Sequence, residues 1–225
     1  MDISDKNALR RQVESLRWFH QIDFGDGIIS PGWIKASKIR RMSRLIFDRP
    51  IVGKSVLDIG CWDGAYSIEA ARRGAGRVLA TDHFAWAPGS WGDRRCFDLA
   101  RTHLAPQIEV MDADLSDLTP DRIGTFDVVL FCGVLYHLRH PLLALEQVAR
   151  LAKEVLVVES RIIAPFSSRP FMRFYPGKEL DGDPTNWWAP NRACLEAMLR
   201  SLGFRTVRFK RPDRRLRRGL FHAER

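Results

Sequence analysis

A short loop rich in glycine and acidic residues is the part of the sequence best suited to chemistry. The run from Leu57 to Gly64 begins in an apolar segment, contains Gly60 and Gly64, and leads into a helical pattern. Glycine allows a close approach of the backbone to a ligand, and the first N–H groups of a helix are free to donate hydrogen bonds. Asp82 ends the next apolar run, 22 residues after Gly60. A carboxylate there can accept hydrogen bonds from ribose hydroxyls, so the pattern predicts a nucleoside cofactor.

The charges of the loop favour one class of cofactor. A dinucleotide fingerprint has three glycines, whereas this loop has two, with bulky Trp62 between them. Asp58 and Asp63 would repel a pyrophosphate but tolerate a sulfonium and an ammonium group. S-adenosylmethionine (SAM) carries both cations and no phosphate. The electrostatics therefore favour SAM, and a nicotinamide-dependent oxidoreductase is the disfavoured alternative.

Alternating strands and helices are expected to position these residues. Strands are predicted at 55–59, 77–81, 108–111, 126–131, 154–159, 204–209 and 220–223, and helices at 1–20, 36–48, 66–73, 91–104, 141–152 and 191–202. The alternation predicts an α/β fold with a doubly wound, mostly parallel, seven-stranded Rossmann-like sheet and an antiparallel C-terminal edge. We expect residues 1–50 to form an N-terminal helical lid segment and residues 51–225 the SAM-binding domain. The irregular stretches 21–35 and 164–190 are long enough to be lids or walls.

The composition is that of a globular protein. The 225 residues are 45% apolar and 28% charged, which excludes bulk disorder. No apolar run is long enough for a transmembrane helix, and the polar N-terminus lacks the features of a signal peptide. The four cysteines are widely spaced, so we expect no metal site and no disulfide framework. A cytoplasmic protein without a membrane partner is the simplest expectation.

The net charge of +9 is concentrated in two stretches. Residues 35–54 hold seven basic residues against one acid, and residues 205–225 hold nine against two. These stretches can be solvated faces or a rim that contacts phosphates. Residues 211–219 are expected to be a hairpin loop between the last two strands.

Three motifs in this order resemble the class I SAM-dependent methyltransferases. They are Val56-Leu57-Asp58-Ile59-Gly60-Cys61-Trp62-Asp63-Gly64, then Ala80-Thr81-Asp82, then the run from Phe126 to Pro141. The resemblance covers residues 55–160. A finer resemblance, to the branch of the tRNA wobble-uridine carboxymethyltransferases, rests on Gly133-Val134-Leu135-Tyr136-His137 with Arg139 and Pro141, on Asp23-Phe24-Gly25-Asp26-Gly27, and on Phe204.

The resemblance implies a set of cofactor-binding residues. The loop with Asp58, Gly60 and Gly64 would hold the amino-acid part of SAM, and Asp82, with His83 and Phe84, its ribose. The adenine would be bordered by Asp114, Leu115 and Ser116, and the reactive methyl by Cys132 and Tyr136. Trp33 and Lys38 have the five-residue spacing of a Trp and Lys pair that helps to bind the cofactor in the wobble-uridine branch.

Gln21 is the clearest departure from that branch. The carboxymethyl-transferring enzymes use a lysine to hold the extra carboxylate of carboxy-SAM, and Gln21 stands in the nearest matching segment here. A carboxylate-bearing cofactor would lose this cationic partner. We therefore expect ordinary SAM and plain methyl transfer rather than carboxy-SAM.

Two histidines are candidates for the base that transfer to a hydroxyl requires. His137 follows Tyr136 and is predicted, with it, to be catalytic, and His140 is the other candidate. The alternative for each histidine is a capping or packing role. Arg139 could contact an acidic group of the substrate or form a salt bridge.

Aromatic residues of the stretch 164–190 are candidates for binding the acceptor. Trp187, Trp188 and Tyr175 could stack on a base or a sugar, or cover one end of the sheet. We predict methyl transfer to an oxygen or nitrogen of a small-molecule or glycan-like acceptor. The alternatives are a methyl- or carboxymethyltransferase of the tRNA wobble uridine and, in another class, a non-catalytic nucleic-acid-binding module.

Overall fold

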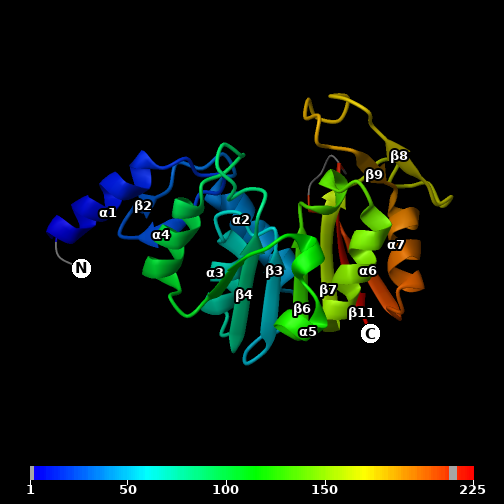
Figure 1. Ribbon diagram of the computed structural model, residues 1–225, viewed down its shortest axis with the longest axis horizontal. Helices are drawn as coiled ribbons and strands as arrows, with labels where there is room; N and C mark the ends of the chain where they lie inside the picture. The colour runs from blue at the N-terminus through cyan, green and yellow to red at the C-terminus, as the bar shows by residue number, and fades with distance from the viewer. Residues whose placement is uncertain (1–2, 213–216) are drawn as a thin grey trace. The chain divides into compact units, whose positions relative to one another are not determined.

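The computed structural model describes residues 3–212 and 217–225, and the chain divides into two compact units (Figure 1). Unit 1 comprises Met1–Lys54 and Gly60–Asp114, and unit 2 comprises Ser55–Ile59 and Leu115–Arg225. The predicted division is a single cut at residue 50 between a lid segment and a SAM-binding domain, whereas each compact unit combines two segments of the chain. The predicted division therefore stays a prediction. No helix of the described ranges is long and apolar enough to cross a membrane.

A seven-stranded sheet has the order β10-β11-β7-β6-β3-β4-β5. Its strands are β3 (Ser55–Ile59), β4 (Arg77–Asp82), β5 (Glu109–Asp112), β6 (Phe126–Cys132), β7 (Ala152–Arg161), β10 (Thr206–Lys210) and β11 (Arg218–Glu224). The pairs β3–β6, β6–β7 and β4–β5 are parallel, whereas β11 is antiparallel to both β7 and β10. The predicted fold class, with its antiparallel C-terminal edge, is confirmed.

In unit 2 two predicted helices pack on this sheet. They are α6 (Pro141–Leu151), which packs against β6 and β7, and α7 (Arg192–Ser201), which packs against β10 and β11 (Figure 1). Pro141 occupies the first turn of α6, where its missing N–H costs nothing. The side chain of Asn191 caps α7 and accepts a hydrogen bond of 2.8 Å from the Cys194 amide. Both helix starts were predicted. The short helices η1 (Leu115–Asp117), α5 (Pro120–Ile123) and η2 (Leu135–His137) were not predicted.

In unit 1 the helices are α1 (Ile3–Ser15), α2 (Ala36–Ile46), α3 (Ala65–Arg72) and α4 (Arg94–Leu104). The predicted apolar side of α2 is confirmed, because Ile39, Met42 and Ile46 are buried. Helix α2 packs against α3, and α3 packs against β4. Polar and basic side chains occupy the exposed side of α2.

Several predicted boundaries were wrong. The first helix ends at Ser15 rather than residue 20, because the chain after it bonds to other parts of unit 1. Helix α4 begins at Arg94 rather than Trp91, since the side chain of Asp93 accepts a hydrogen bond of 2.9 Å from the Arg95 amide and caps the helix there.

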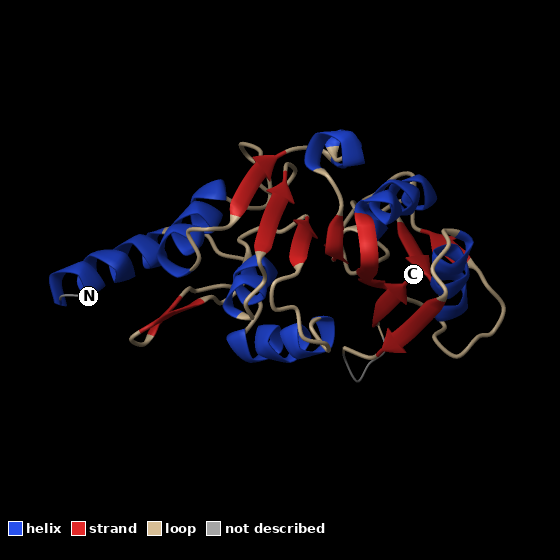
Figure 2. Ribbon diagram, turned by 90° about the horizontal axis from the view of Figure 1, so that it is seen from below, coloured by secondary structure: helices blue, strands red, loops and turns tan. Residues whose placement is uncertain are grey.

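Both stretches predicted to be irregular contain a short antiparallel pair (Figure 2). These pairs are β1 (Asp23–Gly25) with β2 (Ile28–Ile29), and β8 (Met172–Phe174) with β9 (Trp188–Pro190). Of the predicted hairpin loop 211–219, Arg218 and Gly219 belong to β11, and residues 213–216 lie outside the described part of the chain.

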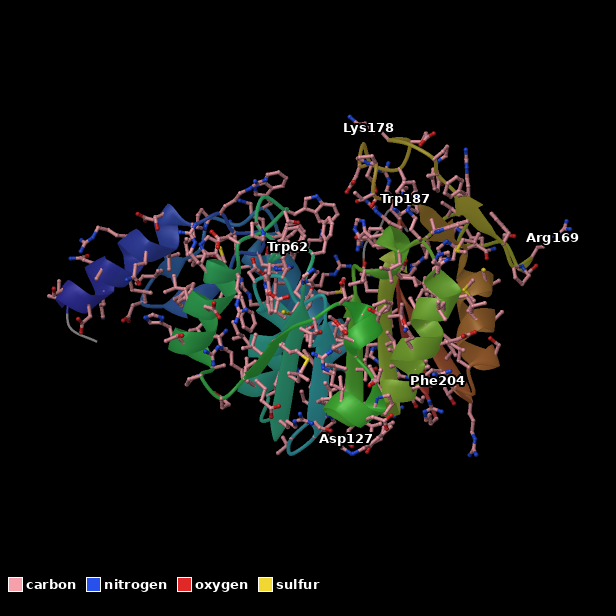
Figure 3. All side chains as sticks on the ribbon, viewed as in Figure 1. Trp62, Asp127, Arg169, Lys178, Trp187 and Phe204 are labelled. Carbon is pink, nitrogen blue, oxygen red and sulfur yellow. The ribbon has the colours of Figure 1, made fainter. Side chains whose placement is uncertain are left out.

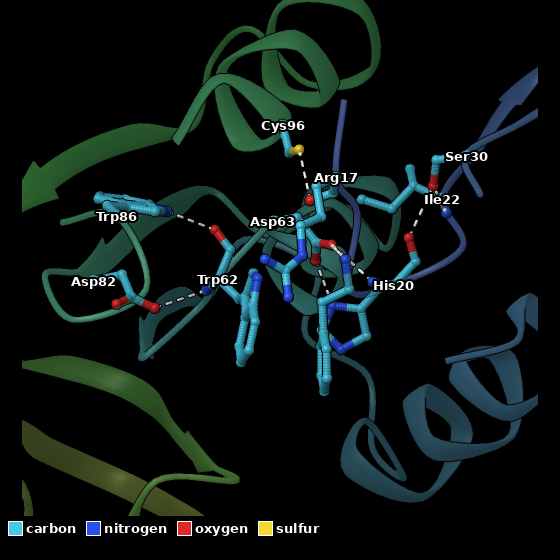
Figure 4. Close-up of polar contacts among 10 residues, drawn as sticks. Arg17, His20, Ile22, Ser30, Trp62, Asp63, Asp82, Trp86 and Cys96 are labelled. Carbon is cyan, nitrogen blue, oxygen red and sulfur yellow. Dashed lines mark hydrogen bonds and ion pairs between the residues drawn. The ribbon is translucent and has the colours of Figure 1, made fainter. Parts of the chain in front are cut away.

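The N-terminal part of unit 1 is held to the glycine loop by the carboxylate of Asp63 (Figure 4). Oδ2 of Asp63 accepts hydrogen bonds from the backbone amides of Phe19, at 3.0 Å, and His20, at 2.8 Å. Oδ1 accepts a short hydrogen bond from Nδ1 of His20. The Asp63 side chain is fully buried, so these donors replace the water that would otherwise solvate the carboxylate.

The backbone around His20 is fixed by further contacts. The amide of Ile34 donates to the Phe19 carbonyl at 2.8 Å, and the hydroxyl of Ser30 donates to the His20 carbonyl at 2.8 Å. A Cβ atom at Gly32 would lie 2.1 Å from the His20 carbonyl carbon, so only glycine fits there. Residues 19–34 are therefore an ordered part of unit 1, anchored at Asp63.

The substitution Asp63→Asn tests this anchor. Asparagine keeps one acceptor oxygen but replaces the other with an NH2 group, which would face a hydrogen-bond donor. The free energy of unfolding should therefore fall by about 3 kcal/mol. Denaturant unfolding measures the change. The control is Asp117→Asn, because Asp117 forms an exposed ion pair with Arg122 at 3.1 Å and its loss should cost less than about 1 kcal/mol. Equal effects of the two substitutions would contradict the anchor.

Candidate functional site

The glycine loop of unit 1 is bonded to the neighbouring strand through its backbone. The amides of Gly60 and Cys61 donate to the Thr81 carbonyl at 2.8 and 3.1 Å. Gly60 and Gly64 have φ angles of +74° and +79°, a region that L-residues with side chains avoid. A Cβ at Gly64 would also lie 2.7 Å from the ring of Phe97. The two glycines of the motif are thus required by conformation and by space.

Asp82 at the end of β4 is bonded directly to this loop. Its Oδ2 accepts a hydrogen bond from the Trp62 amide at 2.9 Å (Figure 4), and its Oδ1 accepts one from the Ala85 amide at 2.9 Å. The Trp62 carbonyl in turn accepts a 2.6 Å bond from Nε1 of Trp86. Burial raises the pKa of the Asp82 carboxyl above its usual value, and the backbone amides oppose that rise. The loop and its acid are therefore one hydrogen-bonded piece.

An aromatic row continues from the loop. The ring of Trp62 stacks on Phe19 with centroids 4.0 Å apart and on Trp91 at 5.9 Å. Trp91 meets Phe84 edge to face at 4.7 Å, and Phe84 is 56% exposed. Trp62 itself has a φ of +54°, a left-handed conformation that is uncommon for a tryptophan. Sequence reasoning missed Phe19 and Trp91, because their distance from the motif in the chain hides the contact.

The other predicted cofactor residues of unit 1 are exposed. Nδ1 of His83 donates to Asp112 at 2.8 Å, and this carboxylate raises the pKa of the imidazole. Asp114 lies 4.0 Å from Nε2 of the same ring. The side chain of Trp33 is 74% exposed, and Lys38 is exposed on the first turn of α2. In the described part of the chain neither side chain bonds to Asp63, whose partners are Phe19 and His20.

In unit 2 the end of β6 carries a buried group of polar side chains. Oη of Tyr136 accepts a hydrogen bond of 3.1 Å from Arg218, whose guanidinium forms a two-point ion pair with Glu159. Burial raises the pKa of both the Tyr136 phenol and the Cys132 thiol, so both stay protonated at neutral pH. Sequence reasoning missed Glu159 and Arg218, which lie on different strands that pair only in the folded sheet.

The remaining predicted residues of unit 2 lie at strand β3 and helix η1. Asp58 is 2% exposed within β3. Leu115 and Ser116 belong to η1, where Ser116 is exposed.

His137 in η2 is held in one tautomer. Its Nδ1 lies 3.1 Å from the Thr185 carbonyl and 2.9 Å from the Thr185 hydroxyl, whose proton is directed to Asp183 at 2.7 Å. Because a carbonyl only accepts, Nδ1 carries the proton and Nε2 the lone pair. Burial lowers the pKa of the imidazole to about 4. His137 is therefore neutral at physiological pH, and its low pKa makes Nε2 a weak base. His140, the other candidate base, is exposed at the N-cap of α6.

The stretch 164–190 is joined to the turn that carries Tyr136. The Trp187 amide donates to the Tyr136 carbonyl at 2.8 Å. Figure 3 shows Trp187 near the body of unit 2, with Lys178 and Arg169 at outer positions of the stretch. The guanidinium of Arg139 lies 3.7 Å from the centroid of the Trp187 ring. Among the residues that the structure describes, Arg139 forms this stacking contact and no salt bridge.

The side chains around the glycine loop fit SAM. Asp82 is an acid bonded to the loop backbone, which suits a ligand without phosphates, whereas the Asp63 carboxylate predicted to face the ligand is buried against Phe19 and His20. A carboxylate has about four acceptor positions, so Asp82 retains capacity for ribose hydroxyls beside its two amide donors. Within residues 3–212 and 217–225 no group of three or more His, Cys, Asp or Glu residues could hold a metal ion.

Comparisons with known proteins identify the family of the chain. Residues 34–208 match the model of a methyltransferase domain. The tRNA U34 carboxymethyltransferase of Pseudomonas aeruginosa is 33% identical over 168 residues, which are 69% of this chain and 46% of that protein. The enzyme of the same name from Methylococcus capsulatus is 29% identical over 225 residues, which are 92% of this chain and 63% of that protein. The chain thus spans about half the length of the Pseudomonas relative.

Solved structures share the fold. The N-terminal domain of EvdMO1, crystallised in the presence of SAH and D-fucose, has a TM-score of 0.71 and 20% identity, and the match covers 100% of this chain and 97% of that chain. The magnesium protoporphyrin IX methyltransferase of Synechocystis, with bound SAM, has a TM-score of 0.59 and 22% identity over 84% of this chain and 78% of its own. The chain therefore belongs to the methyltransferase-domain family and has the class I methyltransferase fold.

Proposed function

We propose that the chain transfers the methyl group of SAM to an oxygen or nitrogen of a small-molecule or glycan-like acceptor. The observation that carries this proposal is the position of His137, whose ring orientation and tautomer are fixed by the contacts of Nδ1 with Thr185. A hydroxyl must lose a proton as it is methylated, and a fixed neutral imidazole can accept it. The EvdMO1 domain crystallised with D-fucose supports a sugar-like acceptor.

The cofactor residues predicted from the sequence keep their roles in this proposal. The carboxylate of Asp82 would accept hydrogen bonds from the ribose hydroxyls, and the backbone at Gly60 would lie against the amino-acid part. The side chains of His83, Phe84, Asp114, Leu115 and Ser116 would border the nucleoside, Cys132 and Tyr136 the reactive end, and Asp58, Gly64, Trp33 and Lys38 would complete the set. Support comes from the bond that joins Asp82 to the loop at Trp62.

The protein residues contribute alignment and proton removal. Bound SAM supplies an electrophilic methyl group on a sulfonium. Nε2 of His137 takes the proton of the acceptor hydroxyl, and Thr185 keeps the ring in place. Holding two reactants in line can lower a barrier by roughly 7 to 11 kcal/mol. The Tyr136 phenol stays protonated and uncharged, so it adds no charge to the ion pair of Arg218 with Glu159.

Two contacts support ordinary SAM over carboxy-SAM. Gln21, which stands where carboxymethyl-transferring relatives have a lysine, accepts a hydrogen bond from the Ala36 amide at 3.2 Å and so has a structural task. The cation beside Tyr136, Arg218, is already neutralised by Glu159. An added carboxylate would therefore have to compete with Glu159 for that guanidinium.

A second candidate acceptor is tRNA, at the wobble uridine. The specific observation is the exposed positive charge of α2 and its N-cap. It comes from Lys35 at the N-cap and from Lys38, Arg40, Arg41 and Arg44 on the helix, and none of the five forms an ion pair in the described part of the chain. Such exposed charge suits phosphate contacts. The relatives named tRNA U34 carboxymethyltransferases support this candidate.

The other basic stretch offers less support for phosphate contacts. Arg208 pairs with Glu224 at 2.8 Å, and Arg225 donates to the carbonyls of Ala149 and Ala152 at 2.7 and 2.9 Å. These arginines serve the fold of unit 2.

Calorimetry tests the assignment of Asp82. The variants Asp82→Ala and Asp82→Asn should bind SAM at least tenfold more weakly, because a hydrogen bond to a charged group contributes roughly 1.5 to 3 kcal/mol. The wild type should bind SAM but not NAD. The control is Asp117→Ala, and circular dichroism verifies the fold of each variant. Unchanged affinity in a folded Asp82 variant would remove the ribose assignment.

The pH profile of kcat/KM tests the assignment of His137. The base must be neutral, and its pKa is about 4, so activity should stay level down to about pH 5 and fall as the pH passes through about 4. His137→Gln should lower kcat by about 10² to 10⁴-fold and abolish this acidic limb. An acidic limb near the ordinary imidazole pKa that persists in the variant would contradict the assignment.

The salt dependence of RNA binding tests the second candidate. If tRNA is the acceptor, its affinity should fall steeply with salt, and replacing Arg40, Arg41 and Arg44 by Ala should reduce the log–log slope by about 2. The matched control replaces Arg150, Arg200 and Arg205, which are also exposed. A wild-type chain that binds no tRNA at low salt would discard this candidate.

A further inference from the structure

The contact of Arg139 with Trp187 places a cation next to the turn that carries His137. Arg139 follows η2 by two residues, and its guanidinium lies 3.7 Å from the centroid of the Trp187 indole. A guanidinium stacked on an aromatic ring is fixed in its plane, while its N–H groups point outward along the edges. Arg139 is exposed, so these donors face solvent.

The turn and the aromatic residue are held as one piece. The Trp187 amide donates to the Tyr136 carbonyl, and His137 is bonded to Thr185, two residues before Trp187. Tyr175 is buried, and its amide donates to the Trp187 carbonyl at 2.8 Å, which holds the middle of the stretch 164–190 against Trp187. The position of Arg139 relative to His137 is therefore set by backbone bonds rather than by a loose loop.

The charges of the neighbouring arginines are already balanced, unlike that of Arg139. Arg218 forms its ion pair with Glu159, and Arg161 forms one with Asp181. Within the described part of the chain no carboxylate pairs with Arg139. A stacked arginine with open edges binds carboxylates and phosphates through two parallel hydrogen bonds.

Aromatic surface continues beside this arginine. Phe174 lies parallel to Trp187, with ring centroids 6.2 Å apart and planes at 9°, and Phe174 is 47% exposed. Flat apolar surface of this kind suits the face of a sugar or another ring. The arrangement combines a base, a ring surface and an anion-binding edge in unit 2.

We infer that Arg139, stacked on Trp187, binds an acidic group of the methyl acceptor, so that the acceptor is a hydroxyl-bearing small molecule with a carboxylate or a phosphate. This inference rests on the proposed function. Arg139 is then a specificity-determining residue: it binds the acceptor, whereas proton removal belongs to His137.

The test labels the product and measures its charge. The full chain is incubated with tritium-methyl SAM and a small-molecule extract of host cells, and the labelled product is separated by anion exchange at pH 8. Retention on the column is expected. Treatment with alkaline phosphatase then distinguishes the two sources, since a phosphomonoester loses retention and a carboxylate keeps it.

Variants of Arg139 connect that charge to the residue. With the small-molecule extract as substrate source, Arg139→Gln should lower the rate at low extract concentration at least tenfold and approach the wild-type rate at high concentration. Arg139→Lys should recover only part of the loss, because lysine cannot bind in two-point fashion. The control Arg150→Gln removes another exposed arginine and should change nothing.

The outcomes separate the inference from the function on which it rests. A neutral labelled product, label that enters only RNA or protein fractions, or an Arg139→Gln variant as active as wild type would overturn the acidic subsite. Tritium in no fraction would contradict methyl transfer itself. Calorimetric affinity for SAM should be the same in all Arg139 variants, which shows that the cofactor site is intact.

Discussion

The buried carboxylate of Asp63 is the constraint on which the candidate cofactor site in unit 1 depends. A charged oxygen pair without access to water must be met by donors, and Phe19 and His20 supply three of them. Satisfying this carboxylate draws a distant segment onto the glycine loop. The stacking of Phe19 on Trp62 follows from the same placement. Trp62 then bonds to Asp82, so the anchor continues into the residue that we assign to the ribose.

In unit 2 the reactive side chains of the candidate site are uncharged. Burial keeps the Cys132 thiol and the Tyr136 phenol protonated and the His137 imidazole neutral. Arg218, the cation in this group, is balanced by Glu159. His137 is thus in its proton-accepting form at physiological pH, but its low pKa makes it a weak base, so its contribution to proton removal depends on the fixed position of its ring. The exposed Arg139 stands apart from this balance, which is why it is the arginine assigned to substrate recognition.

The sequence predicts the elements of the fold better than their contacts. Short-range patterns are sufficient for the strands, for the cap at Asn191 and for Pro141 in the first turn of α6, since each depends on residues close in the chain. The helix predicted through residue 20 was wrong because a long-range acceptor, Asp63, competes for the amides of Phe19 and His20. No pattern within residues 1–20 indicates that a residue more than 40 positions later will bind these amides.

In the candidate site, too, the residues of local motifs could be predicted, whereas their long-range partners could not. The glycines and Asp82 follow from the motif, and the structure joins them by hydrogen bonds. The partners that set the chemistry of His137 and Tyr136, namely Thr185 and Arg218, come from segments 48 and 82 residues away and could not be paired from sequence. For Arg139 the sequence left two roles open, and only the folded chain shows that its guanidinium stacks on Trp187.

The most direct measurement is a crystal structure of the chain grown with S-adenosylhomocysteine. The account predicts that the ribose hydroxyls of the bound molecule lie within hydrogen-bond distance of the Asp82 carboxylate, with the backbone at Gly60 against its amino-acid part. Density for the molecule elsewhere, or side chains of the Trp62 loop filling the space beside Asp82 under saturating ligand, would contradict it.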